Sequence, residues 1–242
     1  MKDRIEKTAP SRSTNTFADI KQYIFRKPPV ETLVDHEKDD SRGDLGKSIL
    51  QRTGINVDNY KMLNIHRVGI EAPASYVFDE LMQWSGDAIC WPNHIAKVSL
   101  QDDKLEHIKI YLLGINIRFL GLNLFHLFDL SAIRIQRIPS DSDFDNARYL
   151  LYECKGGYPI GIFSMYVRTS IPGREEEKEM SQLFMMVSFD FYGRQRMRLK
   201  LLNRLWEKIH NRVTSNMVYR FKELCEWKFE SFVNEKKDIP AS

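Results

Sequence analysis

The sequence of 242 residues lacks the features of several special classes of protein. Its three cysteines, Cys90, Cys154 and Cys225, show no CxxC spacing, which argues against a disulfide framework and favours reduced thiols. No apolar run reaches the roughly 18 residues of a membrane-spanning helix, and the charged first residues precede no apolar segment of a secretory signal. The 36 basic and 33 acidic side chains leave a net charge of only +3. We therefore expect a soluble cytoplasmic protein that does not bind nucleic acid.

Signatures of catalysis and of metal binding are also missing. The six histidines show no HxH or HExxH spacing, and no GxSxG, GxGxxG or phosphate-binding glycine loop occurs. Residues 141–146 match the first half of a calcium loop, but Asn146 stands where that loop needs glycine. A solvated loop is the better interpretation of this segment. We expect neither a metal ion nor a cofactor.

The residues after position 60 do have the content of a folded core, since 43% of the whole chain is hydrophobic and 12% is aromatic. Met62–Ile70 predicts a strand, and Pro73 suits the first turn of a following helix. Apolar residues then alternate with polar ones up to about residue 192, which favours antiparallel strands joined by short turns. The turn Gly156–Pro159 predicts a hairpin.

After Gly193 the apolar period changes from two to 3.6, which predicts one long helix over residues 194–233. Its predicted apolar stripe consists of Leu199, Leu202, Trp206, Ile209, Val213, Met217, Phe221 and Leu224.

Three regions follow from these patterns. Residues 1–60 are highly charged and contain Pro28-Pro29, so we expect a partly ordered extension that lies across the main domain, with a mobile tail as the alternative. A short helix is expected around Phe17–Phe25 within it. Residues 61–233 form the main domain, and residues 234–242 are expected to be a disordered tail.

The order of these elements resembles the helix-grip superfamily that contains START domains, pollen allergens and polyketide cyclases/dehydrases (SRPBCC). The resemblance covers about residues 60–233, and its best local matches are the strand-to-helix segment Val68–Asp79 and the pair Trp91-Pro92. It implies an α+β helix-grip fold, in which a curved antiparallel β-sheet of about seven strands wraps on a long C-terminal α-helix.

The same resemblance implies that a cavity between sheet and helix binds a hydrophobic small molecule or lipid, with transport as a further step. Members of the superfamily include lipid carriers, hormone receptors, aromatic cyclases and co-chaperones, and fold alone does not choose among them. Two alternatives stay open: a cyclase/dehydrase-type enzyme that uses the same cavity, and a non-catalytic protein-interaction module. No pair of residues with fixed catalytic roles emerges, so binding is favoured over catalysis.

Apolar alternation and the helical stripe predict the ligand-binding wall, for which an ordinary filled core is the alternative. His126 is either a polar anchor there or a hydrogen-bonded core histidine. The predicted residues are Ile108, Ile110, Phe125, His126, Ile133, Ile135, Tyr152, Phe163, Met165, Val187, Phe189, Trp206, Ile209 and Val213.

The net charge is unevenly distributed. Residues 194–242 hold 12 basic and six acidic side chains, a balance of 12 − 6 = +6, so the remainder carries −3. We predict that Arg194, Arg196, Arg198 and Lys200 contact an anionic membrane surface, each such residue contributing about 1 kcal/mol near the surface. A solvated outer face of the helix is the alternative. No interleaving of aromatic and basic residues points to nucleic acid.

Overall fold

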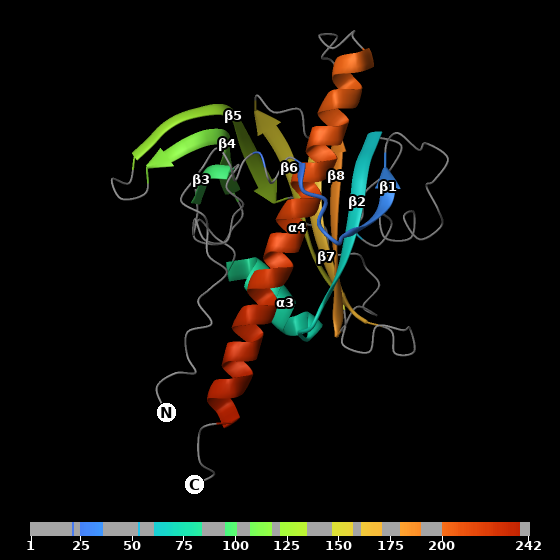
Figure 1. Ribbon diagram of the computed structural model, residues 1–242, viewed down its shortest axis with the longest axis vertical. Coiled ribbons are helices and arrows are strands. Elements are labelled where there is room, and N and C mark those ends of the chain that lie inside the picture. Colours follow the sequence, from blue (N-terminus) through green and yellow to red (C-terminus); the bar gives the residue numbers. More distant parts are fainter. Residues whose placement is uncertain are drawn as a thin grey trace.

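The computed structural model describes residues 21, 25–35, 53, 61–83, 95–100, 107–117, 122–134, 147–156, 161–170, 180–189 and 200–237. Within these ranges, eight antiparallel strands form one sheet in the order β1-β2-β8-β7-β6-β5-β4-β3 (Figure 1). The strands are β1 (Glu31–Asp35), β2 (Lys61–Ile70), β3 (Ile95–Leu100), β4 (His107–Ile117), β5 (Leu122–Arg134), β6 (Ala147–Gly156), β7 (Ile162–Thr169) and β8 (Ser181–Phe189). The helices are α3 (Ala74–Gln83) and α4 (Lys200–Lys237).

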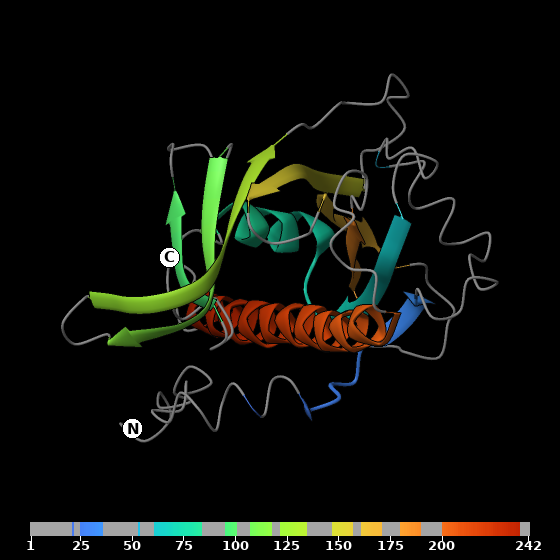
Figure 2. The ribbon, with the colours of Figure 1, turned by 90° about the horizontal axis from the view of Figure 1, so that it is seen from above.

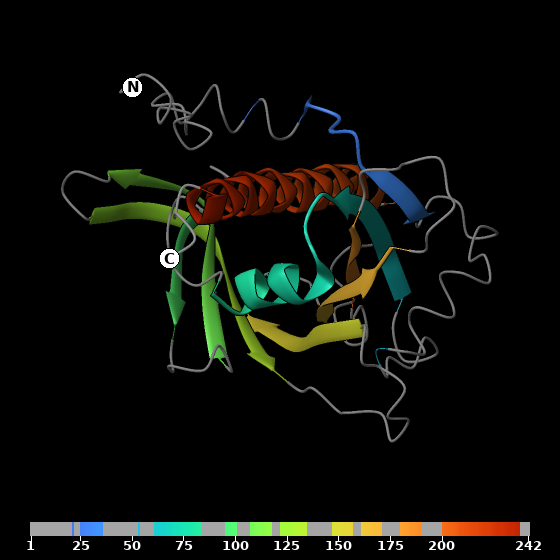
Figure 3. The same ribbon diagram turned by 90° about the horizontal axis from the view of Figure 1, so that it is seen from below.

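The sheet curves around α3, and α4 lies across the open side of the curve (Figures 2 and 3). We call the side of the sheet that faces the two helices its inner face and the other side its outer face. This arrangement confirms the predicted α+β helix-grip fold. The sheet has one strand more than the roughly seven expected, because β1 from the N-terminal region pairs with β2.

Local chemistry explains two of the junctions. The backbone N–H of Val77 donates to the carbonyl of Pro73 over 3.0 Å, so α3 begins directly after the proline, as its fixed φ favours. The predicted hairpin joins β6 and β7, and the N–H of Cys154 donates to the carbonyl of Gly161 over 2.8 Å beside the turn.

The buried side of α4 differs from the predicted apolar stripe in the N-terminal half of the helix. Ile209 and Val213 are only half-buried, whereas His210 and Thr214 are 3% and 2% exposed. Thr214 donates its hydroxyl to the carbonyl of His210 over 3.0 Å, which satisfies a polar group that hydropathy alone would place in solvent. The stripe prediction was therefore wrong by one position here, although Phe221 and Leu224 are buried as expected. The helix continues to Lys237, beyond the predicted end at residue 233.

The described part of the N-terminal region packs against α4 on the side away from the sheet (Figure 2). Asn216 donates its amide N–H to the carbonyl of Arg26 over 3.1 Å, and the Arg26 guanidinium lies 5.2 Å from the ring centre of Tyr219. Pro28 is buried, and β1 follows directly. Residues 25–35 thus cross the helix and join the sheet. The predicted helix around Phe17–Phe25 lies mostly outside the described residues, where only Lys21 and Phe25 are helical.

Both faces of the sheet are buried over β2, β8, β7 and β6. The inner face carries the main core, which α3 and α4 cover. The outer face carries a second, smaller cluster that consists of Ile65, Tyr149, Leu151, Ile162, Tyr166, Phe184 and Met186, with Leu33 packed against it. No helix within the described ranges combines the length and the apolar character needed to cross a membrane.

Candidate functional site

The inner face of the sheet carries two rows of side chains that run across the strands. In an antiparallel sheet, directly opposed residues lie on the same face, so the strand register defines each row. The first row consists of Asn64 on β2, Val187 on β8, Phe163 on β7 and Tyr152 on β6. Neighbouring strands lie about 4.8 Å apart, so this row spans roughly 14 Å.

The second row runs beside the first. It consists of His66 on β2, Met185 on β8, Met165 on β7 and Leu150 on β6. Every residue of both rows is 5% exposed or less. Each row is therefore apolar across three strands and ends at a polar residue of β2.

An aromatic stack closes the far end of the first row. The rings of Tyr152 and Phe163 lie 4.9 Å apart between centres and only 9° from parallel. The sequence left open which way Tyr152 and Tyr166 point. Tyr152 faces the main core, whereas Tyr166 faces the outer cluster, where its ring lies 5.6 Å from that of Phe184.

The polar end of the rows contains buried atoms without hydrogen-bond partners. Asn64 is fully buried, and neither its Nδ2 nor its Oδ1 has a partner. His66 is 1% exposed, and its Nδ1 lies 3.2 Å from the hydroxyl of Thr32. Asn211 on α4 forms hydrogen bonds with His66 through its side chain and its backbone. Buried polar atoms are almost always hydrogen-bonded, so the two unpartnered atoms of Asn64 require an explanation.

His66 is a neutral member of this group. Burial lowers the pKa of His66 from 6.5 to about 4, and hydrogen bonds with the side chain and backbone of Asn211 only partly offset that shift. At neutral pH the imidazole therefore acts as a hydrogen-bonding group without charge.

The Cys154 thiol on the inner face is not a nucleophile at neutral pH. Cys154 pairs with Ala132 across β6 and β5, and burial raises the pKa of its thiol to about 12. It therefore stays protonated at neutral pH and is unreactive. Cys154 and Cys225 are both buried, and Cys90 lies outside the described residues. In the described ranges, no three His, Cys, Asp or Glu side chains lie together as a metal site would need.

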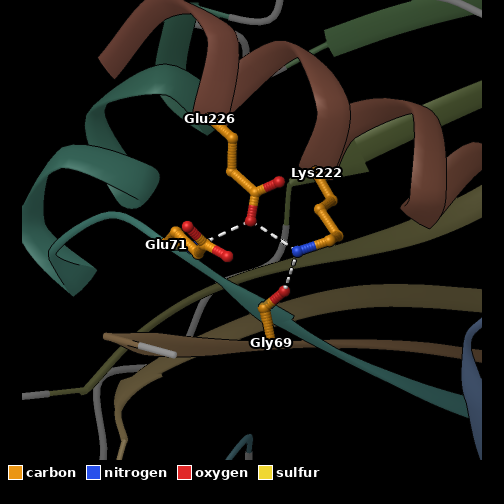
Figure 4. Close-up of polar contacts among 4 residues, drawn as sticks. All are labelled: Gly69, Glu71, Lys222 and Glu226. Carbon is orange, nitrogen blue, oxygen red and sulfur yellow. Dashed lines mark hydrogen bonds and ion pairs between the residues drawn. The ribbon is translucent and has the colours of Figure 1, made fainter. Parts of the chain in front are cut away.

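The C-terminal half of α4 is attached to the end of β2 by paired polar groups (Figure 4). Lys222 donates its ammonium to the carbonyl of Gly69 over 2.7 Å and forms an ion pair with Glu226. The backbone N–H of Glu71 donates to Glu226 over 2.8 Å. Further along α4, Lys228 pairs with Glu80 of α3 over 2.6 Å. These contacts fix α4 against the β2–α3 junction.

Six of the predicted wall residues lie together in the main core of the inner face. The residues that the structure brings together are Ile108, Ile110, Tyr152, Phe163, Met165 and Val187.

Ile133 does not belong with them. It pairs with His107 and is 37% exposed, whereas its neighbour Ala132 pairs with Ile108 and is fully buried. Successive side chains of a strand point to opposite faces, so placing Ile108 and Ile133 in one wall was an error. The larger apolar side chain suggested the inward position, but the small Ala132 occupies it.

The remaining predicted residues are described only in part. Ile135, Arg194, Arg196 and Arg198 lie outside the described residues. For five others the structure gives the backbone alone, in β5, β8 and α4; these are Phe125, His126, Phe189, Lys200 and Trp206. Their roles stay predictions, as does the contact of the basic segment with a membrane.

Sequence reasoning missed the polar end of the rows. Asn64 and His66 occupy alternate positions of β2 that continue with the buried Val68 and Ile70. Polar residues on the otherwise apolar face of a buried strand are a signal that the sequence does carry. The approach of Asn211 from α4 has no comparable sequence signal.

Comparison with known proteins finds distant structural likenesses that carry no argument. No protein-family model matches the sequence, and no curated protein matches it either. Solved structures that align with it include the Zhui aromatase/cyclase from a Streptomyces species (18% identity, 66% of this chain and 91% of that chain, TM-score 0.41). A conserved protein from Geobacillus kaustophilus aligns with 14% identity over 66% of this chain and 93% of that chain, with a TM-score of 0.39.

A third example is the di-domain ARO/CYC protein StfQ from the steffimycin biosynthetic pathway. It aligns with 12% identity over 84% of this chain and 59% of its own, with a TM-score of 0.38. Identities and TM-scores this low carry no argument about ligand or reaction. The resemblance to the helix-grip superfamily holds at the level of the order and arrangement of the elements in this chain.

Proposed function

We propose that the protein binds a hydrophobic small molecule between the inner face of its sheet and α4. The observation that carries the proposal is the pair of apolar rows, which end on β2 beside Asn64, a fully buried residue whose amide has no hydrogen-bond partner. An ordinary filled core rarely leaves such atoms without partners, whereas ligand sites typically combine an apolar wall with a few polar groups.

Burial of apolar surface would supply most of the binding free energy. Each Å² of apolar ligand surface removed from water contributes roughly 25 cal/mol, before the costs of association are subtracted. The aromatic stack of Tyr152 on Phe163 and the thioethers of Met165 and Met185 offer such surface along the rows.

Acid–base catalysis is less well supported than binding. A general base works best when its pKa lies near the working pH, but the pKa of His66 is lowered to about 4. The Cys154 thiol is held protonated by a pKa of about 12. These groups suit recognition of a ligand better than proton transfer to it.

Native mass spectrometry of the protein purified from its own host tests the proposal directly. We expect an additional mass that is lost after extraction with organic solvent and regained from a lipid extract of the same cells. A protein that is empty on isolation and stays empty in the extract would overturn the proposal.

Two substitutions on neighbouring residues of β5 provide a matched pair. Ala132→Phe adds a ring on the inner face, whereas Ile133→Phe adds bulk on the outer face. If a ligand occupies the interior, Ala132→Phe reduces the ligand-loaded fraction at least fivefold, and Ile133→Phe leaves it unchanged. Equal loading of both variants would contradict the proposed position of the ligand.

A further inference from the structure

We propose that the side of α4 away from the sheet, together with residues 25–27 that lie on it, binds the surface of an anionic lipid bilayer. This docking surface consists of Phe25, Arg26, Lys27, Leu205, Lys208 and Arg212. It is separate from the inner face of the sheet, so it does not depend on the proposed ligand.

The helical residues of the docking surface share one side of α4. Leu205, Lys208 and Arg212 follow each other at intervals of three and four positions, which line up along a helix, and the next such interval leads to Asn216. At a rise of about 1.5 Å per residue, this stripe extends about 16 Å from Leu205 to Asn216. Asn216 contacts the N-terminal segment, which crosses α4 on the side away from the sheet (Figure 2). The stripe therefore faces away from the sheet.

Residues 25–27 lie beside this stripe. The Asn216 amide donates to the carbonyl of Arg26 over 3.1 Å, and the Arg26 guanidinium lies 5.2 Å from the ring centre of Tyr219. Phe25 and Lys27 are the immediate neighbours of Arg26 in the chain, so they lie at the same part of α4. Segments 190 positions apart in the sequence thus meet on one surface.

Two large apolar side chains of this surface are exposed to solvent. Phe25 is 73% exposed and Leu205 is 54% exposed, the two highest values among the exposed large hydrophobic residues of the described ranges. Single exposed apolar residues are common, but two of this size on one side of a molecule are typical of a binding surface. The interfacial layer of a bilayer accepts such side chains, because their burial there removes apolar area from water.

The charged side chains of the docking surface are basic. Arg26, Lys27 and Lys208 are exposed, and Arg212 is half-buried. Each Lys or Arg close to an anionic membrane surface strengthens binding about fivefold. The predicted membrane-contact residues, which end at Lys200, directly precede this part of α4 in the sequence and have the same sign of charge.

The combination of charge and exposed apolar side chains selects the partner. An anionic bilayer attracts the basic residues and also accepts Phe25 and Leu205. A nucleic acid would attract the same basic residues through its phosphates, but it gains little from an aliphatic side chain such as Leu205. The acidic residue that continues the stripe beyond Asn216, Glu223, lies 3.8 Å from the Arg220 guanidinium, which offsets its charge.

Co-sedimentation of the full chain with vesicles tests the proposal. We compare vesicles of phosphatidylcholine alone with vesicles of equal parts phosphatidylcholine and phosphatidylserine. At low ionic strength we expect at least tenfold tighter binding to the vesicles that contain phosphatidylserine, and this preference should weaken as salt screens the charges. Equal binding to both kinds of vesicle, or binding to neither, would overturn the proposal.

Three single variants and a control locate the surface. Phe25→Ser and Leu205→Ser, on different segments, should each weaken binding to the anionic vesicles about fivefold, since each removes an apolar side chain that enters the bilayer. Lys27→Glu should weaken it at least fivefold at low salt and have a smaller effect at high salt. Phe232→Ser is the control: Phe232 is 44% exposed near the opposite end of α4 and should not affect binding.

Each outcome of the variant experiment decides for or against the docking surface. Wild-type binding by both Phe25→Ser and Leu205→Ser, or an equal loss with Phe232→Ser, would overturn it. Binding of a DNA duplex as tightly as the anionic vesicles, with no effect of Leu205→Ser, would assign the basic residues to a nucleic acid and also overturn it. The four variants lie away from the apolar rows and should keep the wild-type fraction of bound hydrophobic ligand, so failure of either proposal leaves the other in place.

Discussion

The two halves of α4 meet β2 in opposite ways. In the C-terminal half, Phe221 and Cys225 pack in the main core, and Lys222 and Glu226 make paired polar contacts with the end of the strand. In the N-terminal half, Asn211 hydrogen-bonds to His66 of the strand, but the amide of the buried Asn64 has no hydrogen-bond partner. Between α4 and β2, the polar groups are thus paired at one end of the interface and incompletely paired at the other.

This difference indicates that the C-terminal half of α4 attaches the helix to the sheet; we call this half the anchor. Each buried polar atom left without a partner costs about 1–3 kcal/mol, so the N-terminal half holds β2 less firmly than the C-terminal half does. We expect the helix to separate from the sheet first at its N-terminal half, where access to the apolar rows is needed. The four predictions below test this comparison.

The largest expected difference concerns packing in the two halves. Phe221→Ala in the C-terminal half should lower the free energy of unfolding by about 3–5 kcal/mol, because it leaves a void in the core. Thr214→Val in the N-terminal half keeps the shape of the side chain and should cost at most about 1 kcal/mol. Urea unfolding measures both, and equal losses would contradict the assignment of the anchor.

The second prediction concerns the pH dependence of the free energy of unfolding that arises from His66, which lies on β2 beside the N-terminal half of α4. The pKa of His66 is 6.5 in the unfolded chain and about 4 in the folded one, so the unfolded state binds the proton first as the pH falls. Stability from this residue is complete above about pH 6.5 and is lost towards pH 4, by about 3 kcal/mol in total. His66→Gln should remove this part of the dependence. Urea unfolding at pH 7 and pH 4.5 compares the two proteins, and identical losses on acidification would exclude His66 as the cause.

The third prediction concerns the ion pair at the anchor. Lys222→Met leaves the Gly69 carbonyl and Glu226 without their shared partner and should cost about 1–2 kcal/mol, since both side chains are partly buried. Combining it with Glu226→Gln in a double-mutant cycle gives the coupling between the two residues. Glu235→Gln, exposed near the end of the same helix, serves as the control, with an expected change within about 0.5 kcal/mol. If the cycle shows no coupling between Lys222 and Glu226, then apolar packing alone holds the C-terminal half of α4 against β2.

The smallest effect is expected on the other side of the helix. Arg26→Ala removes a cation–π contact with Tyr219 that is worth about 0.5–1 kcal/mol at an exposed position. Thermal unfolding of the full chain should therefore show a shift of only a few degrees at most. A larger loss would mean that residues 25–35, rather than the C-terminal contacts, hold α4 in place.

Most of the architecture follows from local periodicity, which the sequence displays directly. The alternation of Leu183, Met185 and Val187 predicts β8, and the change of period after Gly193 predicts α4. The strand β1 escaped prediction because its stability depends on β2, through pairs such as Glu31 with Arg67, whose carboxylate and guanidinium lie 2.6 Å apart. The charged residues around β1 form no alternating apolar pattern that would indicate pairing with β2.

The candidate site also has features that the sequence predicts and features that it does not. Tyr152, Phe163, Met165 and Val187 were predictable because apolar alternation marks the inner face of each strand. The rows that they form were not predictable, since rows depend on the register between strands. The polar end depends in addition on how α4 lies over β2, which neither segment specifies alone.

The strand β1 has a consequence for any shortened form of the protein. It pairs with the outer edge of β2, from Glu31 opposite Arg67 to Asp35 opposite Asn64. A chain that begins at residue 61 would expose that edge, and an exposed strand edge is a template on which further molecules add strands. Such a chain would also lose Thr32, the hydrogen-bond partner of His66. The N-terminal segment thus covers an edge of the sheet, and we expect that its removal would promote self-association through β2.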